Sequence, residues 1–144
     1  MPTIWTIGYE QTTMPAFLAA LQGAGVELVA DVRAIAASRR PGFSKTALAA
    51  NLAEAGIGYR HFRALGTPPE GRAAARALDL AKLKRVYSGQ LELPEALAAG
   101  AELADLAHDR RVALLCYERE PACCHRTLLR QAVLPDCEAI DLYP

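Results

Sequence analysis

The sequence predicts a three-layer α/β fold, in which helices cover both faces of a mainly parallel sheet of about five strands. Strand-like apolar segments alternate with segments of helical spacing along the chain, an order typical of this class. The segment 111–117, RVALLCY, is apolar almost without a break, as expected of a strand covered on both faces. The length of 144 residues suits one domain, so we expect a single α/β domain over residues 1–144.

The first two strands and the helix between them follow from composition and spacing. Residues 3–9 have strand composition, and residues 26–32 form an apolar strand. Between them, apolar side chains repeat at i, i+3, i+4 and i+7, which predicts a helix with Thr12 or Thr13 as its N-cap. Glycines are expected to end this helix before the second strand.

The next stretch predicts a helix, a strand and a loop. Ser44 is placed to cap a helix that ends at Gly56, and residues 57–62 then form a third strand. The Pro- and Gly-rich segment 65–71 predicts a loop that interrupts regular structure. One helix is expected after it, over about residues 72–87.

The remaining segments complete the alternating order. Pro94 suits the first position of a helix that runs to about His108, so two successive helices form a long crossover. The fourth strand is the apolar segment 111–117. A helix over residues 124–134 and a last strand over residues 137–143 follow.

Composition predicts a folded protein whose charges produce no strong net electrostatic field. Hydrophobic residues make up 52% of the chain and charged residues 22%, unlike a disordered chain. Sixteen basic and sixteen acidic residues cancel, which excludes non-specific coating of nucleic acid or of a membrane by bulk charge. The N-terminus lacks a leader pattern, so we expect a cytoplasmic protein with no membrane partner. Because cytosolic thiols are kept reduced, free thiols are expected at its four cysteines.

Polar residues gather after the predicted strands. Ligands of parallel α/β sheets bind beyond the carboxyl ends of the strands, and those ends meet at one edge of the sheet. The sequence therefore predicts a site at this edge. Its candidate members follow four strands: Tyr9 and Glu10; Asp31, Arg33, Ser38 and Arg39; His61; and Glu118, Cys124, His125 and Arg126.

Arginines make an anion the first candidate ligand. Arg126 lies near a predicted helix start, where a cation is unfavourable by about 0.3–1 kcal/mol unless an anion or a carboxylate compensates. With the backbone N–H groups of that helix start and Arg33 or Arg39, it could hold a phosphate or a carboxylate. Structural ion pairs, Arg126 with Glu118 and Arg33 with Asp31, are the alternative.

Two carboxylates and one aromatic side chain have candidate roles. Asp31 and Arg33 share one face of their strand, so Asp31 could position an arginine, brace the loop or take part in catalysis. Glu118 is placed at a strand end, where it could act as an acid or base. Tyr9 could stack on a ligand ring or pack in the core. His125 could bind ligand or relay protons.

The cysteines allow a thiol site or a metal site. Cys124 near a helix start, beside His125 and Arg126, would have a lowered pKa and could act as a nucleophile. A phosphatase-type loop does not fit, because Cys116 is too far from Arg126 in sequence. A metal site would draw on Cys116, Cys123, Cys124, His125 and Cys137, but the paired spacing of structural zinc sites is missing, so no metal and no cofactor are predicted.

Four ordered segments resemble the uncharacterised family called domain of unknown function 488. They are TIGYE (6–10), LVADVRAIAASRRPGFS (28–44), GIGYRHFRALG (56–66) and ALLCYEREPACCHRTLL (113–129). After the Asp-Val-Arg motif the family tends to have proline, where this chain has alanine. The resemblance implies a compact α/β domain whose motif residues cluster, and it implies no activity. The carried-over positions are Asp31, Arg33, Ser38, Arg39, Glu118, Cys124, His125 and Arg126.

The residues favour an anion-binding pocket at the carboxyl edge of the sheet, for a small anionic or phosphate-bearing ligand such as a nucleotide or a nucleic-acid end. Arg33, Arg39 and Arg126 would hold the anion. A thiol-dependent transferase or phosphatase-like enzyme using Cys124, resembling rhodanese folds in that Asp-Val-Arg follows a strand there too, is one alternative. A binding module without catalysis is the other. Enzyme activity, strand order and oligomeric state are left open by the sequence.

Overall fold

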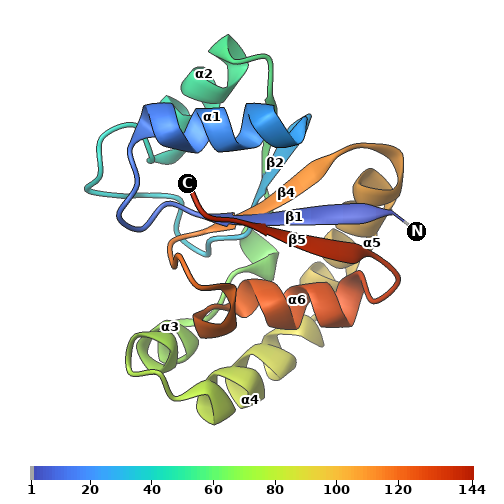
Figure 1. Ribbon diagram of the computed structural model, residues 1–144. Helices are drawn as coiled ribbons and strands as arrows, with labels where there is room; N and C mark the ends of the chain where they lie inside the picture. Colours follow the sequence, from blue (N-terminus) through green and yellow to red (C-terminus); the bar gives the residue numbers. More distant parts are fainter. Residues whose placement is uncertain (1) are drawn as a thin grey trace.

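The computed structural model describes residues 2–144, the side chain of Cys123 excepted, and has the predicted three-layer α/β fold (Figure 1). Five strands form one sheet in the order β3-β2-β4-β1-β5, and every neighbouring pair is parallel. The strands are β1 (Thr3–Gly8), β2 (Leu28–Asp31), β3 (Gly58–His61), β4 (Val112–Cys116) and β5 (Glu138–Leu142).

Strand register brings the carboxyl ends of the central strands together. Gly8 at the end of β1 pairs with Cys116 at the end of β4, and Asp31 at the end of β2 pairs with Leu115. A Cβ on Gly8 would lie 1.8 Å from the Glu118 carbonyl oxygen, so only glycine permits this close approach. The segments after β1, β2 and β4 therefore meet at one edge of the sheet.

Helices cover both faces of the sheet (Figure 1). Phe17 and Leu21 of α1 (Met14–Ala24) and Leu48 of α2 (Lys45–Glu54) pack with one set of buried strand side chains. Tyr87 of α4 (Leu80–Leu91) and Leu103 of α5 (Pro94–Asp109) pack with the other set. The remaining helices are α3 (Pro69–Arg76), α6 (His125–Val133) and the short 3₁₀ turns Arg63–Leu65 and Pro121–Cys123.

The predicted single helix over residues 72–87 is wrong. The chain forms α3 and α4 instead, separated at Leu78, which has a φ of 57°, a conformation that cannot continue a right-handed helix. Asp79 caps α4 by accepting a hydrogen bond from the backbone N–H of Lys82. The expected loop 65–71 is also shorter than predicted, because Pro69 occupies the first turn of α3, where a missing N–H costs nothing.

The caps of the first two helices differ from each other. Thr13 caps α1 through a hydrogen bond from the Ala16 N–H, as predicted for one of the two candidate threonines. Ser44 stands at the N-cap of α2 but makes no cap hydrogen bond. Its hydroxyl instead accepts from the Ser38 N–H and donates to the Ser38 carbonyl, closing the loop after β2.

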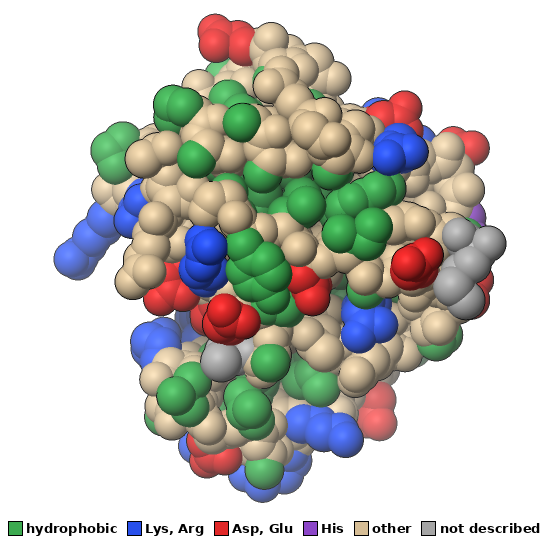
Figure 2. Space-filling view, in the orientation of Figure 1, with side chains coloured by type: hydrophobic (Ala, Val, Ile, Leu, Met, Phe, Trp, Pro, Cys, Tyr) green, Lys and Arg blue, Asp and Glu red, His purple; other side chains and the backbone are tan. Residues whose placement is uncertain are grey.

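Charges of both signs are interspersed on the face shown in Figure 2. This distribution agrees with the net charge of zero and with the expectation of no strong net electrostatic field. Among the helices in residues 2–144, none is long and apolar enough to cross a membrane.

Candidate functional site

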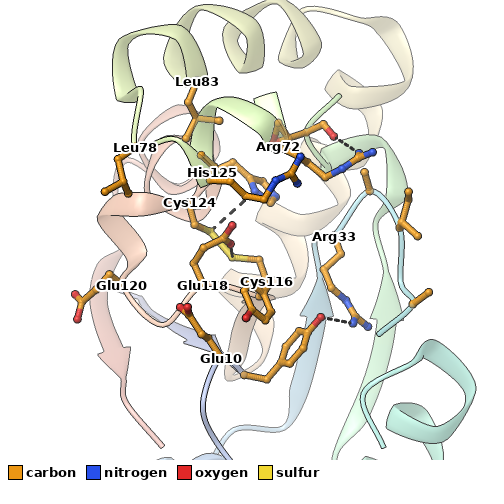
Figure 3. A pocket seen from close by; sticks show the side chains of 18 residues that line it. Glu10, Arg33, Arg72, Leu78, Leu83, Cys116, Glu118, Glu120, Cys124 and His125 are labelled. Atoms are coloured by element: carbon orange, nitrogen blue, oxygen red, sulfur yellow. Dashed lines mark hydrogen bonds between the residues drawn. A yellow bond between two sulfur atoms is a disulfide. The ribbon is translucent and has the colours of Figure 1, made fainter. Parts of the chain in front are cut away.

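A cavity of about 660 Å³ opens at the carboxyl edge of the sheet (Figure 3). Residues after β1, β2 and β4 form its floor and one side, and α3 with the following turn forms the other side. This volume lies in the range of small-molecule sites, and the position is the one at which parallel α/β sheets bind ligands. The cavity therefore defines the candidate site.

Asp31 and Arg33 form a buried ion pair, of which Arg33 lines the cavity. The Asp31 side chain is 0% exposed, and its oxygens accept from the Arg33 Nε at 2.8 Å and Nη2 at 2.7 Å. Arg33 Nη1 donates to the Tyr9 hydroxyl and to the Phe43 carbonyl. Burial alone would lower the pKa of Arg33, but hydrogen bonds and charge attraction from Asp31 raise this pKa above its ordinary value. Most of the Arg33 donors are thus committed within the protein.

Tyrosines complete this network. Tyr59 donates its hydroxyl proton to Asp31, and burial together with this bond raises the tyrosine pKa. Tyr9 stacks on Phe43 with ring centroids 4.7 Å apart, so the Tyr9 ring is mainly packed against protein, although Tyr9 also lines the cavity. Asp31 consequently holds Arg33 and Tyr59 directly, and Tyr9 is tied to this network through Arg33.

Arg126 braces the loop between β4 and α6. Its side chain is 0% exposed and does not line the cavity, and Nη2 donates to the backbone carbonyls of Glu118 and Arg119. Among the described residues, Nε and Nη1 have no hydrogen-bond partner. Burial lowers the pKa of Arg126 to about 10, opposed by nearby acidic groups, Glu118 foremost. The anion or carboxylate expected to contact this arginine is replaced by carbonyl oxygens of the loop, and Glu118 acts on it through its charge.

The prediction of free thiols is wrong for two of the four cysteines. Cys116, at the end of β4, and Cys124, at the N-cap of α6, are joined by a disulfide, while Cys137 is free and buried. Both joined residues are 2% exposed and line the cavity. Cys116, which the sequence did not place among the candidate site residues, therefore lines the candidate site. The Cys124 Sγ also accepts from the Arg126 backbone N–H at 3.3 Å.

Glu118 lies between the disulfide and the open part of the cavity (Figure 3). Its Oε2 is 3.4 Å from the Cys116 Sγ. Burial raises the pKa of Glu118 above its ordinary value, and the Glu10 carboxylate adds to this shift, whereas Arg126 and Arg76 act against it. A carboxyl group with a raised pKa next to sulfur can both hold and release a proton.

His125 is held as a neutral imidazole. Its Nε2 lies 2.6 Å from the Val32 carbonyl, which can only accept, so this nitrogen carries the proton. Burial lowers the pKa of His125 to about 4. The unprotonated Nδ1 lies 4.0 Å from the Cys124 Sγ, on the cavity side.

The structure does not bring every predicted site residue to the cavity. Ser38 closes the loop after β2, Arg39 is exposed, and neither lines the cavity. His61 is also outside it and contacts the Arg33 carbonyl. The cavity does bring together Tyr9, Glu10, Arg33, Glu118, Cys124 and His125.

Two arginines of α3 line the cavity and were missed from the sequence. Arg72 donates to the Thr67 carbonyl at 2.9 Å and is half-buried, and Arg76 is exposed. They were missed because residues 65–71 were expected to be a loop, which leaves the direction of the following helix undefined. Their spacing of four residues, which places both on one helix face, was the available signal.

Among the side chains that the structure describes, two clusters have the donor atoms of a metal site. The sulfurs of Cys116 and Cys124 and a ring nitrogen of His125 lie within 4.8 Å of one another, but in this structure the two sulfurs bond to each other. A cation there would need both thiolates. The second cluster is His108, Asp136 and Cys137; here His108 is already paired with Asp136 at 2.7 Å.

The fold and the cavity define an α/β protein with a ligand-sized site at the carboxyl edge of a parallel sheet. The family model described as Domain of unknown function DUF488 matches residues 13–133, and the chain belongs to this family. No curated protein and no solved structure matches the chain.

Proposed function

We propose that the cavity binds a small ligand that carries an anionic group, next to the Cys116–Cys124 pair. The observation that carries this proposal is the meeting, in one cavity, of the Arg72 and Arg76 side chains with Glu118 and the cysteines. Guanidinium groups are the side chains best suited to bind phosphate and carboxylate oxygens.

The charge of the cavity is divided between its sides. Figure 3 shows Arg72 and Glu10 on opposite sides, with Glu118 and the disulfide between them. Leu78 and Ile35, 65% and 60% exposed, add apolar surface at the rim. We therefore expect the anionic group to bind at α3 and a neutral or cationic part to face Glu10.

This arrangement replaces the predicted anion clamp. Arg33 is committed to Asp31, and neither Arg39 nor Arg126 lines the cavity, so Arg72 and Arg76 take the anion-binding role in the proposal. Candidate ligands are still those expected from the sequence, including nucleotides and other phosphate-bearing molecules.

Thermal unfolding with a ligand panel tests the proposal. A ligand at about 100 times its Kd stabilises a protein by about 2.7 kcal/mol, which raises Tm by several degrees. We expect phosphate, sulfate or a nucleotide to raise Tm, and Arg76→Gln to remove this rise because one guanidinium is lost.

Arg85→Gln is the matched control, since Arg85 is exposed on the neighbouring α4 and does not line the cavity. This control should respond to the ligands as the parent does. Equal ligand-induced shifts in the parent and in Arg76→Gln would rule out the proposed anion site.

Thiol chemistry is a second candidate, favoured by the place of Cys124. This residue caps α6 and receives a backbone N–H at its sulfur, an interaction that stabilises a thiolate when the pair is reduced. Both candidates use one cavity, so the ligand of the first would be the substrate of the second.

A further inference from the structure

We infer that Cys116 and Cys124 exchange disulfides with small disulfide molecules that carry anionic groups. Cys124 is the attacking thiol, and Cys116 is the thiol that closes the protein disulfide. This inference rests on the proposed function, because it names the class of substrate that the same cavity would take.

The two sulfurs differ in what surrounds them. Cys124 starts α6, where its sulfur accepts the Arg126 N–H at 3.3 Å and faces the unprotonated Nδ1 of His125 at 4.0 Å. Cys116 ends a fully buried strand, and its neighbour is the Glu118 carboxyl at 3.4 Å. A sulfur at a helix start is the better thiolate, so Cys124 attacks first.

The contact between Cys116 and Glu118 couples oxidation of the cysteine pair to the transfer of a proton. A disulfide sulfur carries no proton, so a hydrogen bond across this contact requires the proton on Glu118 when the pair is oxidised. In the reduced protein, the Cys116 thiol can donate it instead. Glu118 is thus placed to take the Cys116 proton as the disulfide closes.

The exchange balances with no further reactant except solvent water. The Cys124 thiolate attacks one sulfur of R–S–S–R, which forms a Cys124–S–S–R bond and releases RS⁻. Cys116 then gives its proton to Glu118, and its thiolate attacks the Cys124 sulfur, which releases the second RS⁻. The Cys124 proton goes to the first RS⁻ and the Cys116 proton stays on Glu118, so the second RS⁻ takes its proton from solvent water. The protein dithiol is oxidised and the small disulfide is reduced to two thiols.

The cavity walls set the preferred substrate. Arg72 and Arg76 lie on the α3 side, within the same cavity as both sulfurs. A disulfide with carboxylates can place them at these guanidinium groups while its sulfurs reach Cys124. Neutral and cationic disulfides lack this interaction, so they are expected to react more slowly.

Intact-mass measurement of the reduced protein tests the inference. The background protein carries Cys123→Ser and Cys137→Ala, so that Cys116 and Cys124 are its only two cysteines. This protein is mixed with oxidised glutathione, neutral hydroxyethyl disulfide or cationic cystamine and quenched in acid. Each rate is divided by that of the same disulfide with dithiothreitol, which removes intrinsic reactivity.

We expect the background protein to lose the mass of two hydrogens with no adduct retained. Cys116→Ser should keep one glutathionyl group, and Cys124→Ser should react about tenfold more slowly. Glu118→Gln should slow the closing step, seen as a longer-lived adduct. Corrected rates should be about tenfold higher for oxidised glutathione than for hydroxyethyl disulfide, and Arg76→Gln should remove most of that preference.

Several results would overturn the inference. Cys124→Ser reacting as fast as the background removes the role given to Cys124, and equal corrected rates for all three disulfides remove the substrate class. If a serine variant does not fold, peptide mapping of the adduct in the background protein decides, and an adduct on Cys116 contradicts the assignment. The proposed function fails on a separate result, namely ligand-induced shifts in Tm that are equal in the parent and in Arg76→Gln.

Discussion

The two buried arginines near this site, Arg33 and Arg126, have different hydrogen-bond partners. Arg33 and Arg126 are both buried arginines, yet Arg33 has a carboxylate partner and Arg126 donates to backbone carbonyls. From the sequence, the Arg33–Asp31 pair was the alternative to anion binding by Arg33, and an anion or a carboxylate was expected to compensate Arg126. The sequence could not show that Arg126 turns away from the cavity, because that depends on how the loop after β4 folds back on the helix start.

His125 is expected to make the free energy of unfolding fall at acidic pH. The His pKa is about 4 in the folded state, below its ordinary value of 6.5, so the unfolded chain binds a proton that the folded protein does not. Stability is unaffected above pH 6.5 and is lost as pH falls from 6.5 to about 4. The loss attributable to His125 is about 3 kcal/mol. Urea unfolding at a series of pH values should show it, and His125→Gln should reduce it.

His108 is the matched control for this experiment. Hydrogen bonds to Ala104 and Asp136 raise the pKa of His108, so its contribution to stability is present at low pH and is lost as pH rises through that pKa. His108→Gln should therefore retain the acid-dependent loss. An unchanged loss in His125→Gln would contradict the buried neutral imidazole.

At the scale of elements, the sequence predicts the strands and most of the helices. All five strands lie within the expected ranges. Continuous apolar runs mark the buried central strands β2 and β4, whereas β3 and β5 are largely exposed or half-buried edge strands without such a run. The break between α3 and α4 was missed, since the left-handed Leu78 has no local signature and Asp79 was not recognised as an N-cap. This error matters for function, because it hid the helix that carries Arg72 and Arg76.

The end of α1 provides a paired test of helix termination. Gly25 caps this helix with a φ of 71°, whereas Gly23 lies inside the helix with no atom near an added Cβ. Gly25→Ala should destabilise the protein by about 1 kcal/mol or more through backbone strain and contact with Arg111. Gly23→Ala should stabilise it by up to about 1 kcal/mol. Urea unfolding of both variants tests this, and equal effects would contradict the cap.

For the whole molecule, the sequence predicts where the site lies but not how it is built. The carboxyl ends of the parallel strands indicated the edge at which polar residues meet, and Glu118, Cys124 and His125, which were expected at this edge, line the cavity. The disulfide was missed because Cys116 and Cys124 belong to a strand and a helix start, whose approach is set by the intervening loop. The α3 wall was missed because it comes from a segment distant in sequence.

The central claim is that the anion site and the cysteine pair share one cavity, and the most direct test is the rate at which dithiothreitol opens the Cys116–Cys124 disulfide with and without adenosine monophosphate. We predict that the nucleotide slows opening in the parent as it saturates, that sodium chloride at equal ionic strength does not, and that Arg76→Gln is not protected. A nucleotide that raises Tm while leaving the opening rate of the parent unchanged would contradict the claim, because its site would then lie elsewhere.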